Sequence, residues 1–134
     1  MKGLVFDTSA LLRYFFGEPG AEDIRALFAE KNEGVRHVLC SVNLSELYVV
    51  LGRSVGGDSI EEAWGRIQEL GFELVAPDEA MARKAADFKL RYRMAQGDAF
   101  AAACAQVEGL PLITSDQGFR PLSKEIKIRW VADV

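Results

Sequence analysis

Short apolar runs alternate with longer segments of helical periodicity along this chain. The short runs are rich in β-branched and aromatic residues and follow turn residues such as Gly34, Gly71 and Gly109, which is typical of strands. They predict strands at residues 2–6, 35–40, 72–75, 112–114 and 126–130.

Between these runs, apolar residues recur three and four positions apart, which predicts amphipathic helices. Thr8 or Ser9 is expected to cap the first helix, and Ser59 and Glu62 have the spacing of a capping box. The predicted helices cover about residues 7–16, 20–31, 41–53, 60–70, 78–93 and 97–108.

Strands that alternate with helices indicate an α/β fold, with a central, mostly parallel sheet. Such sheets carry helices on both faces, so we expect a three-layer α/β/α architecture. At 134 residues, without an internal repeat or a linker, the chain is expected to form a single domain over residues 1–134.

Composition narrows the class of protein. The chain is 49% hydrophobic, which argues against disorder. Its net charge of −4 argues against general, sequence-independent electrostatic binding of nucleic acid. Asp7 and Arg13 interrupt the N-terminal apolar stretch, so no signal peptide is expected, and no apolar run reaches the roughly 18 residues of a membrane span. We expect a cytoplasmic protein in which Cys40 and Cys104 are reduced core thiols.

Four acidic residues occur in apolar surroundings, which is costly for a carboxylate without a positive partner. Asp7 and Asp116 each follow a predicted strand, at the end of a parallel sheet where ligands bind. Glu46 lies within a predicted apolar helix, and Asp98 opens an Ala-rich one.

The surroundings of the two helical acids predict that both point inward. Helical spacing places four residues on the face of Glu46, which is therefore expected to be buried: Val42, Asn43, Val49 and Val50. Asp98 shares its face with Ala101, Ala102 and Ala105, whose small side chains allow the helix to approach the sheet closely.

Carboxylates brought together need a cation. Two of them about 4 Å apart repel by roughly 4 kcal/mol at an effective dielectric constant near 20. An all-oxygen site without a neighbouring His or Cys suits Mg²⁺ or Mn²⁺ better than Zn²⁺. His37, the lone histidine, is expected to be a strand or loop residue without a catalytic role.

Each acid taken alone also has an ordinary interpretation. Asp7 and Asp116 could cap a helix or a turn, and Asp98 could interact with the dipole of its own helix. Glu46 is harder to explain in this way, because Arg53 is its only basic neighbour on the same face within two turns. The four positions together favour a shared metal site.

The ordered set of motifs resembles the PIN domain, specifically the VapC-type toxin ribonucleases of type II toxin–antitoxin systems. That family has an apolar strand ending in Asp-Thr/Ser-Ser, a Glu in a Leu-rich helix, an Asp opening an Ala-rich helix, and a final Thr-x-Asp-x-x-Phe. The matching segments here are Leu4–Leu12, Asn43–Leu47, Gly97–Ala105 and Thr114–Phe119. Each motif alone is weak, but their order and spacing agree over the whole chain.

The resemblance implies a PIN-like fold and a metal-dependent endoribonuclease, in which Asp7, Glu46, Asp98 and Asp116 hold one or two Mg²⁺ or Mn²⁺ ions. The implied chemistry is in-line attack of an activated water on phosphorus, giving 5′-phosphate and 3′-hydroxyl products. Many relatives carry a further acid where this chain has Gly118, so a complete second metal site is not expected.

Two further groups of residues are candidates for supporting roles. Thr8, Ser9 and Thr114 could hydrogen-bond the carboxylates or the scissile phosphate, or serve only as caps and strand-end hydroxyls, and Asn43 could orient Glu46. The candidate phosphate-binding residues are Arg13, Lys89, Arg91, Arg93 and Arg120. The basic segment at 89–93 could equally be the C-terminal end of a helix.

The resemblance also implies partners: an RNA substrate, a small antitoxin protein that blocks the active site, and a second copy of the chain in a homodimer. It implies no membrane association, and DNA binding only through the antitoxin. Some apolar residues at 11–16 could form a binding patch for the antitoxin or belong to a thick core.

Three rival functions remain at this stage. A phosphatase with an aspartyl nucleophile also starts with an Asp after its first strand, but usually has a second Asp where this chain has Ser9. A receiver-type phosphoacceptor needs a paired acid and a late Lys, and neither is evident. A catalytically inactive module that binds RNA or protein is the third, and the presence of all four acids argues against it.

Overall fold

A parallel sheet forms the centre of the molecule. The computed structural model describes residues 2–55 and 60–131. The strand order is β3-β2-β1-β4-β5, and every neighbouring pair is parallel. The strands are β1 (Lys2–Phe6), β2 (Val35–Cys40), β3 (Glu73–Val75), β4 (Leu112–Thr114) and β5 (Ile128–Trp130). The predicted α/β fold with a parallel sheet is confirmed.

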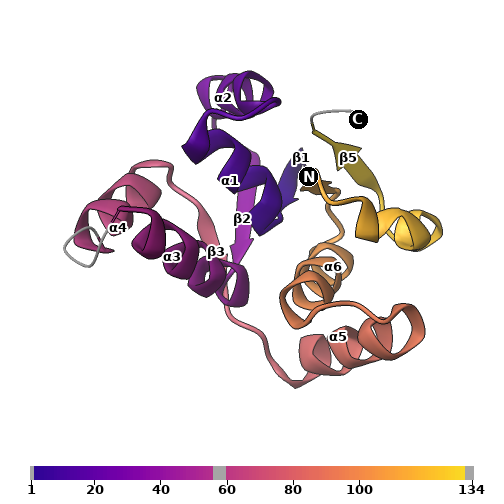
Figure 1. Cartoon of the computed structure of the whole chain (residues 1–134). Coiled ribbons are helices and arrows are strands. Elements are labelled where there is room, and N and C mark those ends of the chain that lie inside the picture. Colours follow the sequence, from indigo (N-terminus) through magenta and orange to yellow (C-terminus); the bar gives the residue numbers. More distant parts are fainter. Residues whose placement is uncertain (1, 56–59, 132–134) are drawn as a thin grey trace.

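Helices connect the strands and cover the sheet (Figure 1). They are α1 (Thr8–Phe16), α2 (Ala21–Ala29), α3 (Ser41–Val55), α4 (Ile60–Glu69), α5 (Glu79–Tyr92), α6 (Gln96–Glu108) and the 3₁₀ helix η2 (Gln117–Lys124). The predicted α-helices agree with these bounds to within about two residues, whereas η2 was not predicted.

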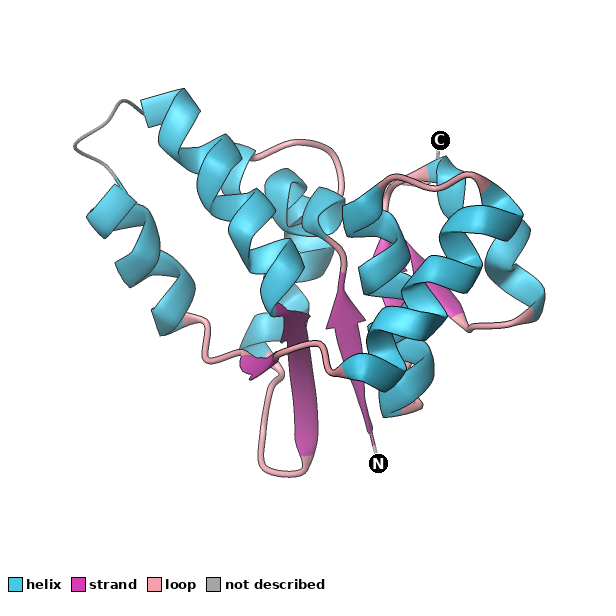
Figure 2. Ribbon diagram, turned by 90° about the horizontal axis from the view of Figure 1, so that it is seen from below, coloured by secondary structure: helices cyan, strands magenta, loops and turns pink. Residues whose placement is uncertain are grey.

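The alternation of side chains along each strand divides the core into two halves. In β1, Val5 packs on the face covered by α5, α6 and η2, whereas Leu4 and Phe6 pack on the face covered by α1 to α4. Figure 2 shows these helix layers on the two sides of the strands. Because both faces are covered, the central strands are apolar at almost every position.

Helix α6 lies directly against the middle of the sheet, where it contacts β1, β2 and β4. The alanines at 99, 101, 102, 103 and 105 are at most 1% exposed. Side chains this small allow the helix axis to approach the strands closely, as the sequence predicted. The close approach fixes the position of the first turn of α6, which carries Asp98.

Two local predictions were wrong. Asp7, rather than Thr8 or Ser9, is the N-cap of α1, because its carboxylate accepts a hydrogen bond from the Ser9 backbone N–H. The last strand begins at Ile128 rather than at residue 126, because Ile126 is buried under the sheet at the end of η2. The predicted capping box at Ser59 lies outside the described residues.

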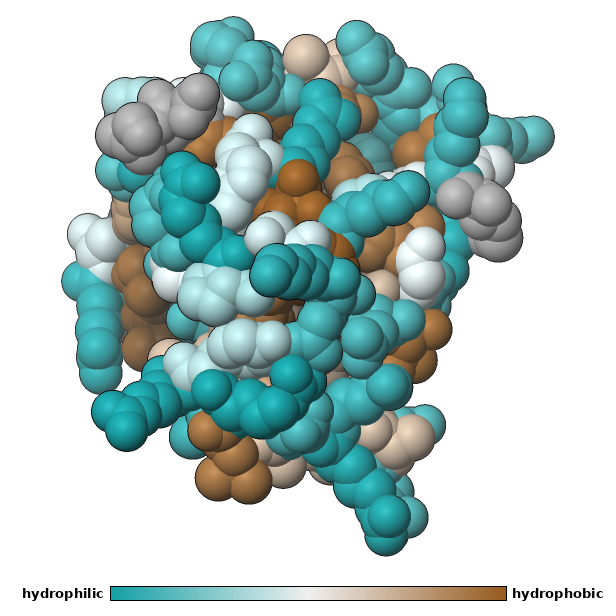
Figure 3. Space-filling model, turned by 90° about the vertical axis from the view of Figure 1, so that its right-hand side faces the viewer, coloured by the Kyte–Doolittle hydropathy of each residue, from teal (hydrophilic) through white to brown (hydrophobic). Residues whose placement is uncertain are grey.

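The two cysteines agree with the prediction. Cys40 and Cys104 are buried free thiols. None of the helices in the described ranges has the length and apolar character needed to cross a membrane. On the face shown in Figure 3, hydrophilic side chains cover most of the surface, and hydrophobic ones are visible as separate areas between them.

Gly3 provides a test of how closely β1 and β2 pack. A Cβ at Gly3 would overlap the backbone carbonyl of Arg36 on β2, and the φ of Gly3 is 158°. We therefore expect Gly3→Ala to lower the free energy of unfolding by about 1–3 kcal/mol, measured by denaturant titration. Gly65→Ala on α4 is the matched control, because a Cβ there meets nothing within 4 Å. Equal stability of the two variants would contradict this account.

Candidate acidic site at the carboxyl edge of the sheet

The first and last of the four acids lie beside each other at the end of two paired strands. Asp7 follows β1, Asp116 lies two residues beyond β4, and Phe6 is in register with Ile113. The strand order reverses between β1 and β4, so this edge is the switch point at which open α/β sheets bind ligands.

Asp7 is held by hydroxyl groups from two elements. Its Oδ2 accepts hydrogen bonds from Ser9 Oγ at 2.6 Å and from Thr114 Oγ1 at 2.8 Å. The side chain is only 1% exposed, and burial raises the pKa of Asp7 although both hydroxyls oppose that shift. Within the described residues, Asp7 Oδ1 has no hydrogen-bond partner, so this oxygen is available to a ligand.

Glu46 on α3 is held in the same way. Its Oε1 accepts from Thr8 Oγ1 at 2.9 Å and from Asn43 Nδ2 at 3.0 Å. Asn43 is fully buried, and its amide also donates to the backbone carbonyl of Gly97 at 3.0 Å. This amide therefore links Glu46 to the first turn of α6, next to Asp98, while Glu46 Oε2 has no partner among the described residues.

Gly97 is a site residue whose role the sequence analysis missed. A Cβ at this position would overlap the carboxylate of Glu46, so only glycine allows α3 and α6 to approach this closely. One signal was present: a glycine in the first turn of an otherwise Ala-rich helix costs about 1 kcal/mol relative to alanine, which indicates a packing reason for it.

Asp98 shows that the four acids share one electrostatic environment. Burial and then repulsion from Asp7, Asp116 and Glu46 raise the pKa of Asp98 to about 7. Asp116 is half-buried, and its Oδ1 accepts a hydrogen bond from the Gly118 N–H at 2.8 Å at the start of η2. Carboxylates from four separate elements thus interact at one edge of the sheet.

The donor set fits a hard divalent cation. All the donors are carboxylate oxygens, which suit Mg²⁺ or Mn²⁺, and a cation would relieve the repulsion that raises the pKa of Asp98. Within residues 2–55 and 60–131, no three His, Cys, Asp or Glu side chains form a group that could hold a metal ion. Binding of one ion by three or more of these carboxylates would therefore require some of the side chains to move.

Comparison with known proteins identifies the family of this chain. The family model for the PIN domain matches residues 4–125. The chain belongs to the PIN domain family. No curated protein matches it in sequence.

Several solved structures share this PIN fold. VapBC-1 from nontypeable Haemophilus influenzae is 16% identical with a TM-score of 0.74, and the match covers 96% of both chains. VapC20 from Mycobacterium tuberculosis, described as a sarcin-ricin loop cleaving toxin, is 16% identical with a TM-score of 0.72, covering 92% of this chain and 95% of that one. A toxin–antitoxin complex from Klebsiella pneumoniae is 23% identical with a TM-score of 0.67, covering 87% and 90%.

The four residues predicted to support the acids lie beside them. Thr8, Ser9, Asn43 and Thr114 all hydrogen-bond Asp7 or Glu46.

The predicted buried face around Glu46 is only partly buried, because Val49 is 47% exposed. Glu46 points towards α6 rather than into a hydrophobic core, and the face turns outward at Val49.

The five basic candidates are not gathered at one point of the PIN domain. Arg13 is half-buried on α1, and Arg93 is the left-handed C-cap of α5. Lys89 donates to Gln96 at 2.9 Å. Arg91 is paired with Asp87 at 2.7 Å and with Glu125 at 2.8 Å, and the Arg120 guanidinium lies 5.1 Å from the Trp130 ring centroid.

Neutralising Asp98 tests the cost of its charge, which is buried beside the other acids. The pKa of Asp98 is raised from its usual 3.8 to about 7, so its charge opposes folding above pH 4. At pH 7.5 in EDTA, we expect Asp98→Asn to raise the free energy of unfolding by about 1–2 kcal/mol, after allowance for partial solvent screening. The gain should vanish below pH 4, where Asp98 is protonated in both the folded and the unfolded state. A variant less stable than wild type at pH 7.5 would contradict this cost of burial and repulsion.

Substitution of Gly97 tests the contact between α3 and α6. We expect Gly97→Ala to displace the Glu46 carboxylate and to weaken Mn²⁺ binding about 10–100-fold, measured by calorimetry. Gly65→Ala again serves as the control in open space. Unchanged affinity in a folded Gly97→Ala protein would show that the position of Glu46 does not matter.

Proposed function

We propose that this PIN domain is a divalent-metal-dependent endoribonuclease that acts as the toxin of a toxin–antitoxin pair. The observation that carries the proposal is the interaction of four carboxylates, from β1, α3, α6 and the end of β4, at one edge of the sheet. Membership of the PIN family and the shared fold with VapC20, described as a sarcin-ricin loop cleaving toxin, support it.

Asp7, Glu46, Asp98 and Asp116 would hold Mg²⁺ or Mn²⁺. When bound, such an ion supplies activated water for attack on phosphorus and offsets negative charge on the leaving oxygen. Asp7 Oδ1 and Glu46 Oε2 are the oxygens proposed to bind it, because the other oxygen of each carboxylate is already hydrogen-bonded. Gly118 contributes no further acid beyond Asp116.

The hydroxyl and amide groups around the acids act by positioning. The hydroxyl oxygens of Ser9 and Thr114 lie 3.1 Å apart, and both hydroxyls donate to Asp7 Oδ2, which fixes the orientation of this carboxylate. Asn43 and Thr8 fix Glu46 from α3 and α1. These hydrogen bonds fix the orientation of two of the four proposed ligands.

The RNA backbone needs cations near this acidic edge, because the chain as a whole is negative. Arg13, Lys89, Arg93 and Arg120 are the proposed phosphate contacts. Arg91 is a weaker candidate, because two carboxylates already neutralise it.

A small antitoxin is the proposed protein partner, and a homodimer is the proposed assembly. Three solved structures of similar fold are toxin–antitoxin or VapBC assemblies, one of them bound to promoter DNA. Here Phe15 and Phe16 line a depression of about 130 Å³ with Arg66, and Phe16 is 42% exposed. This surface on α1 and α4 is a candidate contact for the antitoxin, which would supply any contact with DNA.

Cleavage of RNA tests the activity. With Mn²⁺ or Mg²⁺ we expect purified protein to cut a structured RNA internally, and Asp7→Asn to lower the rate about 100-fold or more through loss of an ionised ligand. EDTA should abolish cleavage, and Lys84→Gln on the exposed side of α5 should leave it unchanged. Cleavage that survives both EDTA and Asp7→Asn would rule out the carboxylate mechanism, and no cleavage of any RNA would favour an inactive binding module.

Bacterial growth tests the toxin role separately. We expect induced expression of the wild-type chain to arrest growth, and Asp7→Asn to relieve the arrest at equal protein level. Co-expression of a short reading frame adjacent to the gene should also relieve it and yield a complex on purification. Ribonuclease activity without growth arrest would instead indicate an RNA-processing enzyme.

A further inference from the structure

Trp130 ends the last strand at the carboxyl edge of the sheet, beside the acidic site. It is in register with Thr114 on β4, and the N–H of the following residue, Val131, donates to the Thr114 carbonyl at 2.9 Å. The Thr114 side chain donates to Asp7, and Asp116 lies two residues beyond Thr114. Because neighbouring strands lie about 4.8 Å apart, Trp130 is placed one strand away from the acids.

The Arg120 side chain reaches this tryptophan from η2. Gln117, the first residue of η2, directly follows Asp116, and Arg120 comes three residues later, one turn of the 3₁₀ helix. The Arg120 guanidinium lies 5.1 Å from the centroid of the Trp130 ring, and its Nε donates to Gln117 Oε1. The ring and the amide together hold this exposed guanidinium in one orientation.

The outer end of the Arg120 guanidinium is free to bind an anion. Within the described ranges, its Nη1 and Nη2 have no hydrogen-bond partner, and no carboxylate forms an ion pair with Arg120. Arg91 differs, because Asp87 and Glu125 already occupy its guanidinium. An oriented guanidinium with two free amino groups suits the oxygens of a phosphate, which accept both hydrogen bonds at once.

The separation of Arg120 from the acids indicates which phosphate it meets. Only three residues lie between Asp116 and Arg120, yet no ion pair joins them in the part of the chain that the structure describes. A cation in contact with the scissile phosphate would also lie against the carboxylates that hold the metal. Arg120 is therefore placed for a phosphate beside the scissile one.

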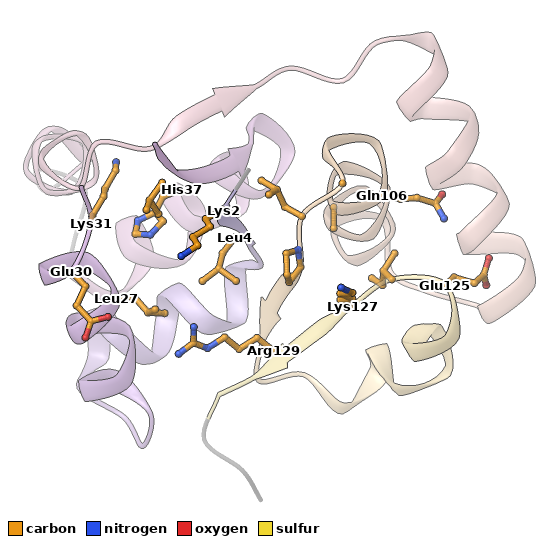
Figure 4. Close-up of a pocket in the computed structure, with 17 residues that line it drawn as sticks. Lys2, Leu4, Leu27, Glu30, Lys31, His37, Gln106, Glu125, Lys127 and Arg129 are labelled. Atoms are coloured by element: carbon orange, nitrogen blue, oxygen red, sulfur yellow. The ribbon is translucent and has the colours of Figure 1, made fainter. Parts of the chain in front are cut away.

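Two other basic residues of the C-terminal segment reach the opposite edge of the sheet. Lys127 and Arg129 line a cavity of about 710 Å³, as do Lys2, Val35 and Pro111, which lie at or just before the start of a strand. Figure 4 shows the side chains of Lys127 and Arg129 at this amino-edge cavity. Most of its charged lining residues are basic: Lys2, Lys31, Lys127, Arg129, Glu30 and Glu125.

We propose that Gln117, Arg120 and Trp130 form a subsite for an RNA backbone phosphate next to the scissile one. Arg120 contacts the phosphate, and Trp130 is the positioning residue that holds Arg120. The subsite rests on the proposed function, because it requires an RNA strand that lies across the acidic edge. A phosphate contact is independent of the base, so this subsite orients the strand and does not select its sequence.

The salt dependence of RNA binding tests the phosphate contact. The full chain, in EDTA, is titrated with a fluorescent single-stranded oligoribonucleotide of mixed sequence. One lost contact should lower the slope of log affinity against log salt by about 0.7, and we expect this for Arg120→Gln, with affinity falling about fivefold. Arg129→Gln removes the same charge from another exposed side chain, at the amino-edge cavity, and should change affinity less than about twofold. Equal effects of the two variants would overturn the proposal.

The positioning role of Trp130 is tested through Arg120. We expect Trp130→Leu to weaken RNA binding about threefold, and Trp130→Phe, which keeps an aromatic face for the guanidinium, to restore most of the affinity. In an Arg120→Gln background, Trp130→Leu should have no further effect, because no guanidinium is left to hold. The same loss in both backgrounds would show that Trp130 acts only through packing. In cleavage assays with Mn²⁺, both single variants should raise KM and leave kcat within about twofold.

Failure of the subsite and failure of the ribonuclease give different results. If the chain cuts RNA in Mn²⁺ while Arg120→Gln behaves like Arg129→Gln, the subsite is wrong and the ribonuclease stands. If no RNA is cut while Arg120→Gln alone lowers the salt slope in EDTA, the ribonuclease is wrong and the chain binds RNA through this subsite. Absence of RNA binding by the wild-type chain would overturn the subsite as well.

Discussion

Asp7 carries a carboxylate where almost no water reaches it, at the end of the strand in the middle of the sheet. Burial alone would neutralise such a group, and the hydroxyls of Ser9 and Thr114 oppose that by donating to one of its oxygens. The same two bonds join β1, α1 and β4 at one point. The other three acids are therefore placed relative to a group that cannot easily move.

The repulsion among the acids lowers the stability of the fold, whereas the proposed function needs these acids close together. In the free protein, burial and then the charges of Asp7, Asp116 and Glu46 raise the pKa of Asp98 to about 7, which lowers the stability of the fold. A sequence selected only for stability would replace one of them with an amide. Their presence together in an otherwise well-packed PIN domain is what a site for a divalent cation requires.

The two edges of the sheet differ in charge because all the strands run parallel. Parallel strands place all their carboxyl ends on one side and all their amino ends on the other. The acids follow the carboxyl ends, whereas Lys2 and Lys127 lie at the amino ends. One small domain therefore presents an acidic edge and a basic cavity at opposite ends of its strands.

Local patterns in the sequence determined the strands, the α-helices and the choice of four acids, because apolar periodicity and an Asp after a strand are both local properties. The sequence could not reveal the contact of Gly97 with Glu46, the buried amide of Asn43, or the contact of Arg120 with the Trp130 ring. It also missed η2, a 3₁₀ helix containing Pro121, and the exposure of Val49. These features depend on which remote segments meet and at what distance, and only the packing of α3 and α6 on a parallel sheet decides that.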